Sequence, residues 1–220
     1  MTTKKLLVAI GFALASSAAS AITVNSLQLA NATPEAITPS DAGWGPISTI
    51  PEGGYKSGFA GTLTALADGV FTATYLGQAA AYGNFFQGST RMNGNSNGGS
   101  IGSTNSINVT AGQAVAFSFG EDNNGDNVAD NGLFANGDAN QQFRGILYFQ
   151  NTFNLEDANG QLFDFLVGYN DSATVNSDYD DYVVGVVNLS EVNQVPVPAA
   201  LPLMASALGL FGLASRRRMR

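Results

Sequence analysis

The stretch that decides the fold class is GTLTALADGVFTATYLG, residues 61–77. Two runs of β-branched, aromatic and small residues flank Asp68-Gly69, a dipeptide typical of tight hairpin turns. Successive side chains in such runs alternate between two faces, as they do along a β-strand. One face of the second run carries Phe71, Ala73 and Tyr75, and the other carries Val70, Thr72 and Thr74. The stretch therefore predicts two strands joined by a hairpin at Asp68-Gly69.

The same pattern recurs along the rest of the chain. Further candidate strands lie in INVTAGQAVAFSF (107–119, divided at Ala111-Gly112), FRGILYFQNTF (143–153), QLFDFLVGYN (161–170) and YVVGVVNLS (182–190). No stretch between the two termini has sustained helical periodicity with caps. We therefore predict an all-β fold, specifically an antiparallel, jelly-roll-like β-sandwich. The segment RMNGNSNGGSIGSTNS (91–106) has little apolar surface to offset its ordering entropy, so it is predicted to be a mobile loop.

Charge is distributed unevenly along the 220 residues. All 17 acidic side chains lie between residues 22 and 194, where Lys56, Arg91 and Arg144 are the only basic ones, so this region has a formal charge of −14. Such a surface repels phosphate backbones, which predicts no nucleic-acid partner and favours cations instead. The chain has no Cys and no His, so disulfides, thiolate chemistry and the usual general base near neutral pH are absent.

Residues 1–21 have the features of a secretory signal peptide. Lys4 and Lys5 precede the apolar run LLVAIGFALA, and Ala19-Ser20-Ala21 supplies the small-x-small pattern at which signal peptidase cuts. An uncleaved membrane anchor or a buried helix is the alternative, but the apolar run is short for a bilayer span. Cleavage after Ala21 makes Ile22 the first residue of the mature protein.

The last residues, VPVPAALPLMASALGLFGLASRRRMR (195–220), differ from everything before them. Prolines at 196, 198 and 202 predict an extended outer end, and the apolar stretch has about the 20 residues that a transmembrane helix needs. The positive-inside rule keeps the basic residues after it in the cytoplasm, namely Arg216, Arg217, Arg218 and Arg220. The preceding domain then lies on the far side of the membrane.

This three-part tail resembles the PEP-CTERM class of sorting signals, most closely its VPLPA variant. The motif residues are Val195, Pro196, Val197, Pro198 and Ala199, and an apolar helix and a basic tail follow them. Val197 stands where the commonest form has Glu, which suits the VPLPA subclass. The resemblance implies processing by an exosortase, a transpeptidase-like enzyme of the membrane. A plain C-terminal tail anchor is the alternative.

Two internal segments also resemble parts of the extracytoplasmic domains of PEP-CTERM proteins. FTATYLGQAAAYGNFF (71–86) is similar to a Y-L-G-x-E-A-type strand, with Gln78 in place of the acidic residue. DFLVGYNDSATVNSDYDDYVVGVV (164–187) is similar to an Asp-rich loop that leads into a final Val-rich strand. The resemblance supports a sandwich and implies an association with exopolysaccharide, but it supplies no activity.

The segment EDNNGDNVADNG (121–132) contains a first candidate metal site. Positions 1, 3, 5 and 9 of a calcium-loop spacing are occupied by Asp122, Asn124, Asp126 and Asp130. Position 6 is Asn127 in place of Gly, and position 12 is Leu133 in place of a bidentate Glu, so this is no EF-hand. The segment is either a looser calcium loop or a solvated turn.

A second candidate site comprises Asp171, Asp178, Asp180 and Asp181. Asp178 and Asp180 point the same way if Asp178 begins the final strand. Carboxylates held this close repel each other unless a cation or protons intervene. Two interpretations therefore stay open, namely a bound calcium ion as cofactor and protection of an edge strand by exposed charge. Sequence alone does not place this cluster and the first one at the same end of the sandwich.

Catalysis by a carboxylate pair would need neither His nor Cys. The glutamates of the chain, Glu35, Glu52, Glu121, Glu156 and Glu191, lie in no recognisable motif, and neither a phosphate-binding loop nor a Ser/His arrangement is present. We therefore predict that the protein is not an enzyme.

The expected organisation is a signal peptide (1–21), an extracytoplasmic domain (22–194) and a sorting signal (195–220). The predicted function is that of an exosortase-processed protein of the cell envelope or extracellular matrix, with a structural or adhesive role associated with exopolysaccharide. Its predicted partners are signal peptidase, exosortase, exopolysaccharide and, transiently, the membrane. The alternative is a calcium-dependent carbohydrate-binding module. Its candidate sugar-stacking residues are Trp44 and Tyr55, which are alternatively interpreted as aromatic side chains that plug loops against the edge of the sandwich.

Overall fold

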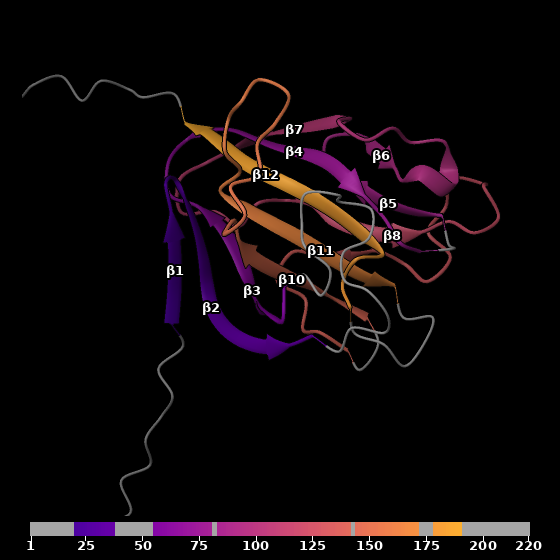
Figure 1. The fold of residues 1–220 in the computed structure, drawn as a ribbon, viewed down its shortest axis with the longest axis horizontal. Helices are drawn as coiled ribbons and strands as arrows, with labels where there is room; N and C mark the ends of the chain where they lie inside the picture. Colours follow the sequence, from indigo (N-terminus) through magenta and orange to yellow (C-terminus); the bar gives the residue numbers. More distant parts are fainter. Residues whose placement is uncertain (1–19, 38–54, 81–82, 142–143, 172–177, 191–220) are drawn as a thin grey trace, which may run out of the picture.

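The computed structural model describes residues 20–37, 55–80, 83–141, 144–171 and 178–190. Most of the predicted signal peptide, Trp44 and the whole predicted sorting signal lie outside these residues. The described residues form twelve β-strands and one 3₁₀ turn, with no α-helix, which confirms the all-β prediction (Figure 1). No helix in this part of the chain has the length and apolar character needed to cross a membrane.

The strands form two antiparallel sheets. In order across the large sheet they are β1 (Ser20–Val24), β2 (Leu27–Ala36), β3 (Ser57–Ala65), β10 (Arg144–Gln150), β11 (Phe165–Asp171), β12 (Tyr182–Ser190), β4 (Gly69–Gly77) and β7 (Thr104–Val109). The small sheet contains β6 (Arg91–Asn93), β5 (Asn84–Gln87), β8 (Ser118–Glu121) and β9 (Phe134–Ala135). The 3₁₀ turn η1 (Asn95–Asn97) follows β6.

An aromatic core joins the two sheets. Of the two faces that alternation predicts for β4, the one that carries Phe71, Ala73 and Tyr75 is fully buried. From the small sheet, Phe119 of β8 stacks on Tyr169 of β11 with ring centroids 5.1 Å apart. Large aromatic side chains dominate such cores because each buries much apolar surface. Two packed antiparallel sheets are consistent with the predicted sandwich.

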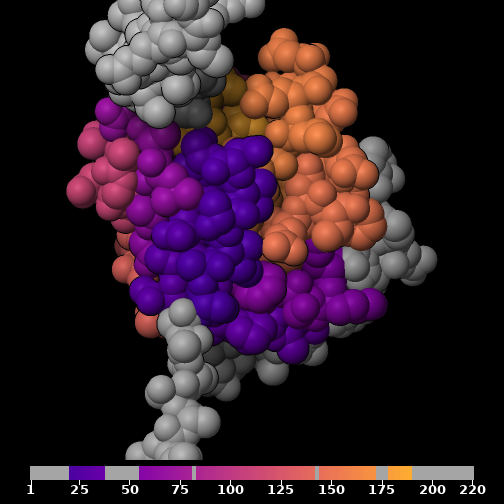
Figure 2. Space-filling view, turned by 90° about the vertical axis from the view of Figure 1, so that its left-hand side faces the viewer, coloured from indigo at the N-terminus to yellow at the C-terminus, as the bar shows by residue number. Residues whose placement is uncertain are grey.

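The central strands of the large sheet are also covered on their outer face. Leu147 of β10 and Leu166 of β11 pack in a second apolar cluster with Leu155 and Phe163, which come from the segment after β10. Figure 2 shows this orange segment beside the indigo β1–β2 hairpin on one face of the molecule. Burial on both faces explains why β11 and β12 read as nearly continuous apolar runs.

The structure contradicts the hairpin predicted at Asp68-Gly69. Strand β3 pairs with β2 and β10, whereas β4 pairs with β12 and β7. Residues 66–68 join β3 to β4 although three other strands separate them in the large sheet. The sheet curls at this end, which brings the two strand ends together. The hydroxyl of Ser26, in the β1–β2 turn, donates to the carbonyl of Asn188 on β12 at 3.0 Å, and the N–H of Leu66 donates to the Ser26 carbonyl at 2.8 Å.

The segment between β7 and β8 is extended and leads from the large sheet to the small one. The predicted break at Ala111-Gly112 is present as a turn, with Gly112 in the left-handed region (φ 78°). The chain then pairs with the end of β3, where the N–H of Val115 donates to the carbonyl of Leu63 at 2.9 Å. It continues without interruption into β8 of the small sheet.

The predicted mobile loop at residues 91–106 is also contradicted, because it contains β6, the turn η1 and the start of β7. Amide side chains hold it in place. The Asn97 amide donates to the carbonyls of Gly83 at 3.0 Å and Asp122 at 3.2 Å, and the Gln78 amide donates to the Ser96 hydroxyl at 2.6 Å. Hydrogen bonds to distant backbone groups replace the apolar burial that this segment lacks.

Candidate metal centre

Three carboxylates converge immediately before β12. Among the described residues, the one group of three or more potential metal ligands is Asp178, Asp180 and Asp181, whose carboxylate oxygens lie within 4.8 Å of one another. We call this group the Asp trio. It does not arise from a strand that begins at Asp178, as predicted, because β12 begins at Tyr182 and Tyr179 adopts a left-handed conformation (φ 57°). A turn of the chain, and not strand alternation, brings the three carboxylates together.

Asp171 lies beside the Asp trio. It ends β11, and its backbone N–H donates to the Asp181 carboxylate at 2.8 Å. The Asn84 amide, from β5 of the other sheet, donates to the Asp171 carboxylate at 2.8 Å and to the Asp181 carbonyl at 3.1 Å. The second predicted cluster is therefore assembled, with Asp171 adjacent to the trio and both linked to the small sheet.

The electrostatics of this group disfavour full ionisation. The pKa of Asp180 is raised to about 7, mainly by burial and next by the charge of the neighbouring Asp178. Burial likewise raises the pKa of Asp181 to about 8, with Asp171 as the main neighbouring charge. Carboxyl groups in this state either keep protons near neutral pH or exchange them for a bound cation. Oxygen ligands of this kind suit a hard cation such as calcium.

A further buried carboxylate faces this group from the small sheet. Glu121, the last residue of β8, is 3% exposed and is paired with Asn84 of β5 in the strand register. Burial raises the pKa of Glu121, and the charge of Asp171 acts in the same direction. One Glu121 oxygen accepts from the Asn131 amide at 3.0 Å. We call the region formed by Glu121, Asn84, Asp171 and the Asp trio the acidic end of the molecule.

The first predicted cluster is organised differently. The Asp122 carboxylate accepts the backbone N–H groups of Gly125 at 2.7 Å and Asn127 at 2.9 Å, and it forms an ion pair with Arg91 at 2.6 Å. Burial opposes ionisation of Asp122, but these partners hold its pKa below the usual range. The carboxylates of Asp126 and Asp130 accept backbone N–H groups of Val128 and Asn123. Internal hydrogen bonds therefore use the oxygens that the calcium-loop hypothesis assigns to a cation.

Asn124, the remaining member of that cluster, belongs to the same internal network. Its side-chain oxygen accepts the N–H of Asp126 at 2.9 Å, and its amide donates to the carboxylates of Asp126 and Asp130. The arrangement matches a self-capped turn, which the sequence left as the alternative to a looser calcium loop.

The structure places both clusters at the same end of the molecule. The N–H of Asp122 donates to the carbonyl of Gly83 at 2.9 Å, and the next residue, Asn84, contacts Asp171 and Asp181. Residues 83 and 84 therefore connect the two acidic groups, which lie far apart in the sequence.

Sequence analysis missed Asn84 and Glu121 as members of a site. A signal for Glu121 was present, because it is in phase with Phe117 and Phe119 in the alternating run FSFGE (117–121). A charged residue on the aromatic face of a strand must be buried or lie at the end of the core. Asn84 is in phase with Phe86 in the same way.

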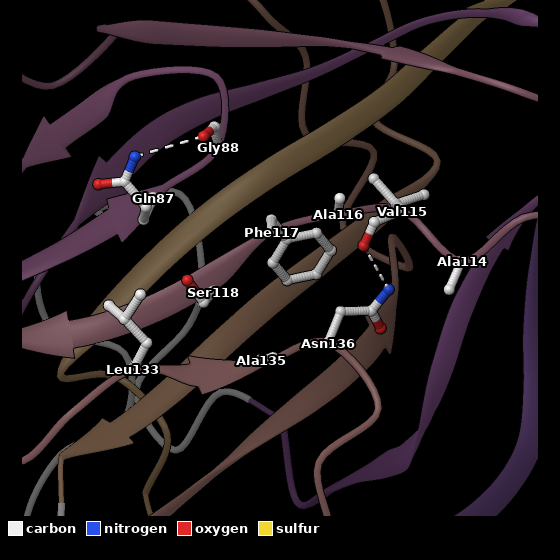
Figure 3. Close-up of a pocket in the computed structure, with 10 residues that line it drawn as sticks. All are labelled: Gln87, Gly88, Ala114, Val115, Ala116, Phe117, Ser118, Leu133, Ala135 and Asn136. Atoms are coloured by element: carbon white, nitrogen blue, oxygen red, sulfur yellow. Dashed lines mark hydrogen bonds between the residues drawn. The ribbon is translucent and has the colours of Figure 1, made fainter.

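An open groove of about 440 Å³ lies over β8 and β9 (Figure 3). Its walls are mainly small or aliphatic, and its two side-chain amides already donate to the protein. The Asn136 amide donates to the carbonyls of Leu63 and Val115, and its oxygen accepts from Tyr148. The Gln87 amide donates to the carbonyl of Gly88. Sugar recognition needs several polar groups that converge on the ligand, so this mainly apolar lining gives no support to sugar binding here.

Tyr55 packs against the protein itself. Its ring centroid lies 4.9 Å from that of Phe149 and 5.0 Å from that of Phe153, and its hydroxyl donates to the carbonyl of Gln150 at 2.8 Å. The structure therefore gives no support to the expected stacking of Tyr55 on sugar rings.

No family model, no curated protein and no solved structure matches the chain. The functional argument therefore rests on the residues and on their geometry.

Proposed function

We propose that the protein is exported, processed by an exosortase and retained in the cell envelope or extracellular matrix. The observation that carries this proposal is the three-part tail, in which the motif Val195–Ala199 precedes an apolar stretch and the basic cluster that ends at Arg220. Such a tail presents an extended peptide just outside a bilayer and holds its basic end in the cytoplasm.

The strand boundaries are compatible with processing at both ends. Regular pairing of β1 with β2 begins at Ile22, which lies opposite Leu29, and an irregularity separates it from the contact between Ser20 and Ala32. Cleavage after Ala21 therefore leaves the regular part of the β1–β2 ladder intact. Strand β12 ends at Ser190, before the sorting motif begins at Val195.

In this proposal the two packed sheets form a jelly-roll-like sandwich with a structural or adhesive role and no catalytic one. Association with exopolysaccharide follows from the resemblance to PEP-CTERM proteins. The region of charge −14 suits a hydrated matrix in which divalent cations link acidic groups.

The test is the intact mass of the protein recovered from the native cell surface. We expect a species that lacks about 21 N-terminal residues and the apolar tail. A variant with Pro196→Ala and Pro198→Ala should keep its tail, because the extended motif is lost. If the main surface species of the unaltered protein still ends at Arg220, the tail is a plain anchor and the exosortase proposal fails.

A second candidate function is calcium-dependent carbohydrate binding, and the Asp trio is the observation that favours it. Asp178 and Asp181 are partly exposed, whereas Asp180 is buried. A calcium ion held there would keep coordination positions open to solvent, where sugar hydroxyls can bind. A glycan array probed with and without calcium tests this function. Binding that requires calcium supports it, and the absence of binding in both conditions leaves the structural role.

A further inference from the structure

The groove over β8 and β9 contains a stretch of backbone that is paired on one side only. This stretch, residues 113–117, leads into β8. The Val115 N–H donates to the carbonyl of Leu63 at 2.9 Å, and the Phe117 carbonyl accepts the N–H of Asn136 at 3.0 Å. Because the backbone groups of successive residues in an extended chain point to opposite sides, those of the intervening residues point away from these partners.

The opposite side of this stretch has no partner in the described part of the chain. Strand β5 pairs with β8 up to Gln87, which lies opposite Ser118, and the chain then turns at Gly88 toward β6. The backbone N–H and C=O groups of Ala114 and Ala116 consequently form no hydrogen bond to a described residue. Both residues are exposed in the wall of the groove (Figure 3). We call Ala114 and Ala116 the open edge.

An unpaired edge of this kind can accept an extended peptide as a further strand. Such a peptide would continue the line of β5 along residues 113–117. The side chains around it are short or aliphatic, because Leu133 and Ala135 line the groove together with the open edge, and Leu133 is 52% exposed. A fitting occupant therefore offers backbone hydrogen bonds and small apolar side chains.

The segment Val195–Ala199, which lies outside the described residues, has this chemistry. Residues that precede a proline are restricted to extended conformations, so the two prolines favour an extended backbone at Val195 and Val197. In a strand, the N–H groups of Val195, Val197 and Ala199 point to one side. Pro196 and Pro198 face the other side and have no N–H to offer. The segment can therefore pair along one edge only, as suits the last strand of a sheet.

The chain leaves the described structure close to this groove. Ser190, at the end of β12, lies opposite Gly69 of β4, which in turn lies opposite Val109 of β7. Two strand spacings, about 10 Å, therefore separate Ser190 from Val109, and the open edge follows Val109 after one turn. Residues 191–194 allow Val195 to lie up to about 16 Å from Ser190. This length is enough for the segment to reach the groove of its own molecule.

We propose that residues 195–199 of the unprocessed chain dock in the groove of the same molecule as an added strand, paired with the open edge. The docked segment is withdrawn from any enzyme that must grip it as an extended peptide, so docking competes with processing. This inference goes beyond the proposed function, because docking does not depend on whether an exosortase cleaves the tail.

Hydrogen exchange of the full-length chain in mild detergent tests the docking directly. The N–H groups of Ala114 and Ala116 should exchange about tenfold more slowly in the unaltered chain than in the double variant Val195→Asp, Val197→Asp, which brings charges to an apolar groove. Mass spectrometry of peptides that cover residues 113–117 measures the rates. The matched control is Val192→Asp, which adds a charge before the motif and should keep the slow exchange. Equal rates in the unaltered chain and the double variant would overturn the proposal.

Crosslinking identifies the molecule that supplies the segment. The chain has no Cys, so the pair Ala116→Cys and Val197→Cys can be introduced and joined with a short bismaleimide. We expect a crosslink within one molecule, with a yield several-fold above that of Leu162→Cys paired with Val197→Cys. Leu162 is the matched control because it is 49% exposed and belongs to a segment that is hydrogen-bonded to β12. Adding Leu133→Asp to the first pair should lower its yield.

Two results of the crosslinking would contradict the proposal. Equal yields for the two pairs mean that the segment does not dock in the groove, and crosslinks between molecules assign the groove to a second copy. Processing of the tail is tested separately by the mass measurement, so either proposal can fail while the other stands.

Discussion

The two ends of β11 each hold a buried carboxylate, and they are built in opposite ways. Asp164, just before the strand, accepts the backbone N–H of Asn188 at 3.0 Å on one oxygen and the Asn25 amide on the other. Asp171, at the far end, lies among further carboxylates and beside the buried oxygens of Asn84 and Glu121 that lack a donor among the described residues. The balance of donors to charges, more than burial itself, separates a structural carboxylate from a candidate site.

The largest expected effect is at the Asp164 end of β11, where each carboxylate oxygen has a hydrogen-bond donor. Asp164→Ala should lower the free energy of unfolding by about 3 kcal/mol, because it leaves the buried N–H of Asn188 without an acceptor. Urea unfolding measures this change. Asp164→Asn keeps one acceptor oxygen and should lose less. A loss below about 1 kcal/mol for Asp164→Ala would show that this end is not held by its carboxylate.

The acidic end should make stability depend on pH. The raised pKa values of Asp180 and Asp181, about 7 and about 8, mean that the folded protein keeps protons that the unfolded chain releases above about pH 4. Rising pH therefore favours the unfolded chain. In chelator, we expect the free energy of unfolding to fall by several kcal/mol between about pH 5 and pH 8.5, since each of these groups costs about 1.4 kcal/mol per pH unit up to its folded-state pKa. Urea unfolding at each pH measures this loss.

Two comparisons sharpen this expectation. The pKa of Asp122 is lowered, so its contribution to stability is lost as the pH falls below about 4, and stability should be greatest near about pH 4. Saturating calcium should reduce the loss at high pH, because bound calcium stabilises the ionised carboxylates. A stability that rises steadily from pH 5 to pH 8.5 in chelator would mean that the carboxylates of the acidic end are not strained by their mutual repulsion.

The smallest expected effect has the opposite sign to that at Asp164. Asp180→Asn should raise the free energy of unfolding by about 1 kcal/mol at pH 8 in chelator, because it removes a buried charge from a crowded group. At pH 5 the gain should be smaller, and it should vanish below about pH 4, where Asp180 is protonated in both the folded and the unfolded chain. Thermal unfolding at the two pH values measures both. The control is Asp126→Asn on the exposed loop, which should change stability by less than about 0.5 kcal/mol at either pH.

Side-chain alternation was sufficient to predict the fold class and most of the long strands. In β4 it correctly divided the side chains between two faces, and the face with the aromatic residues Phe71 and Tyr75 is the one in the core. It did not predict which strands pair. Asp68-Gly69 has the composition of a hairpin, but curling of the large sheet brings β3 and β4 close at their ends without pairing them. Pairing depends on contacts between distant segments, which a local pattern does not contain.

The candidate site was predictable to the extent that it is local in sequence. Asp178, Asp180 and Asp181 lie within four positions, so their mutual repulsion was evident from the sequence. Asn84 lies 87 positions before Asp171, and only the packing of β5 against β11 brings the two together. The order of residues 91–106 was missed for the same reason, because the carbonyls that bind Asn97 belong to distant segments.

Strand β12 pairs with β11 over residues 182–186 on one side and with β4 over residues 183–190 on the other. A mechanical pull on the chain beyond Ser190, directed along the strand, loads the hydrogen bonds of both ladders in shear, so that they resist together. The strand β1 at the sheet edge has a single ladder, and a pull across that ladder opens its bonds one after another. The fold therefore resists force most strongly on the side where the chain leaves β12.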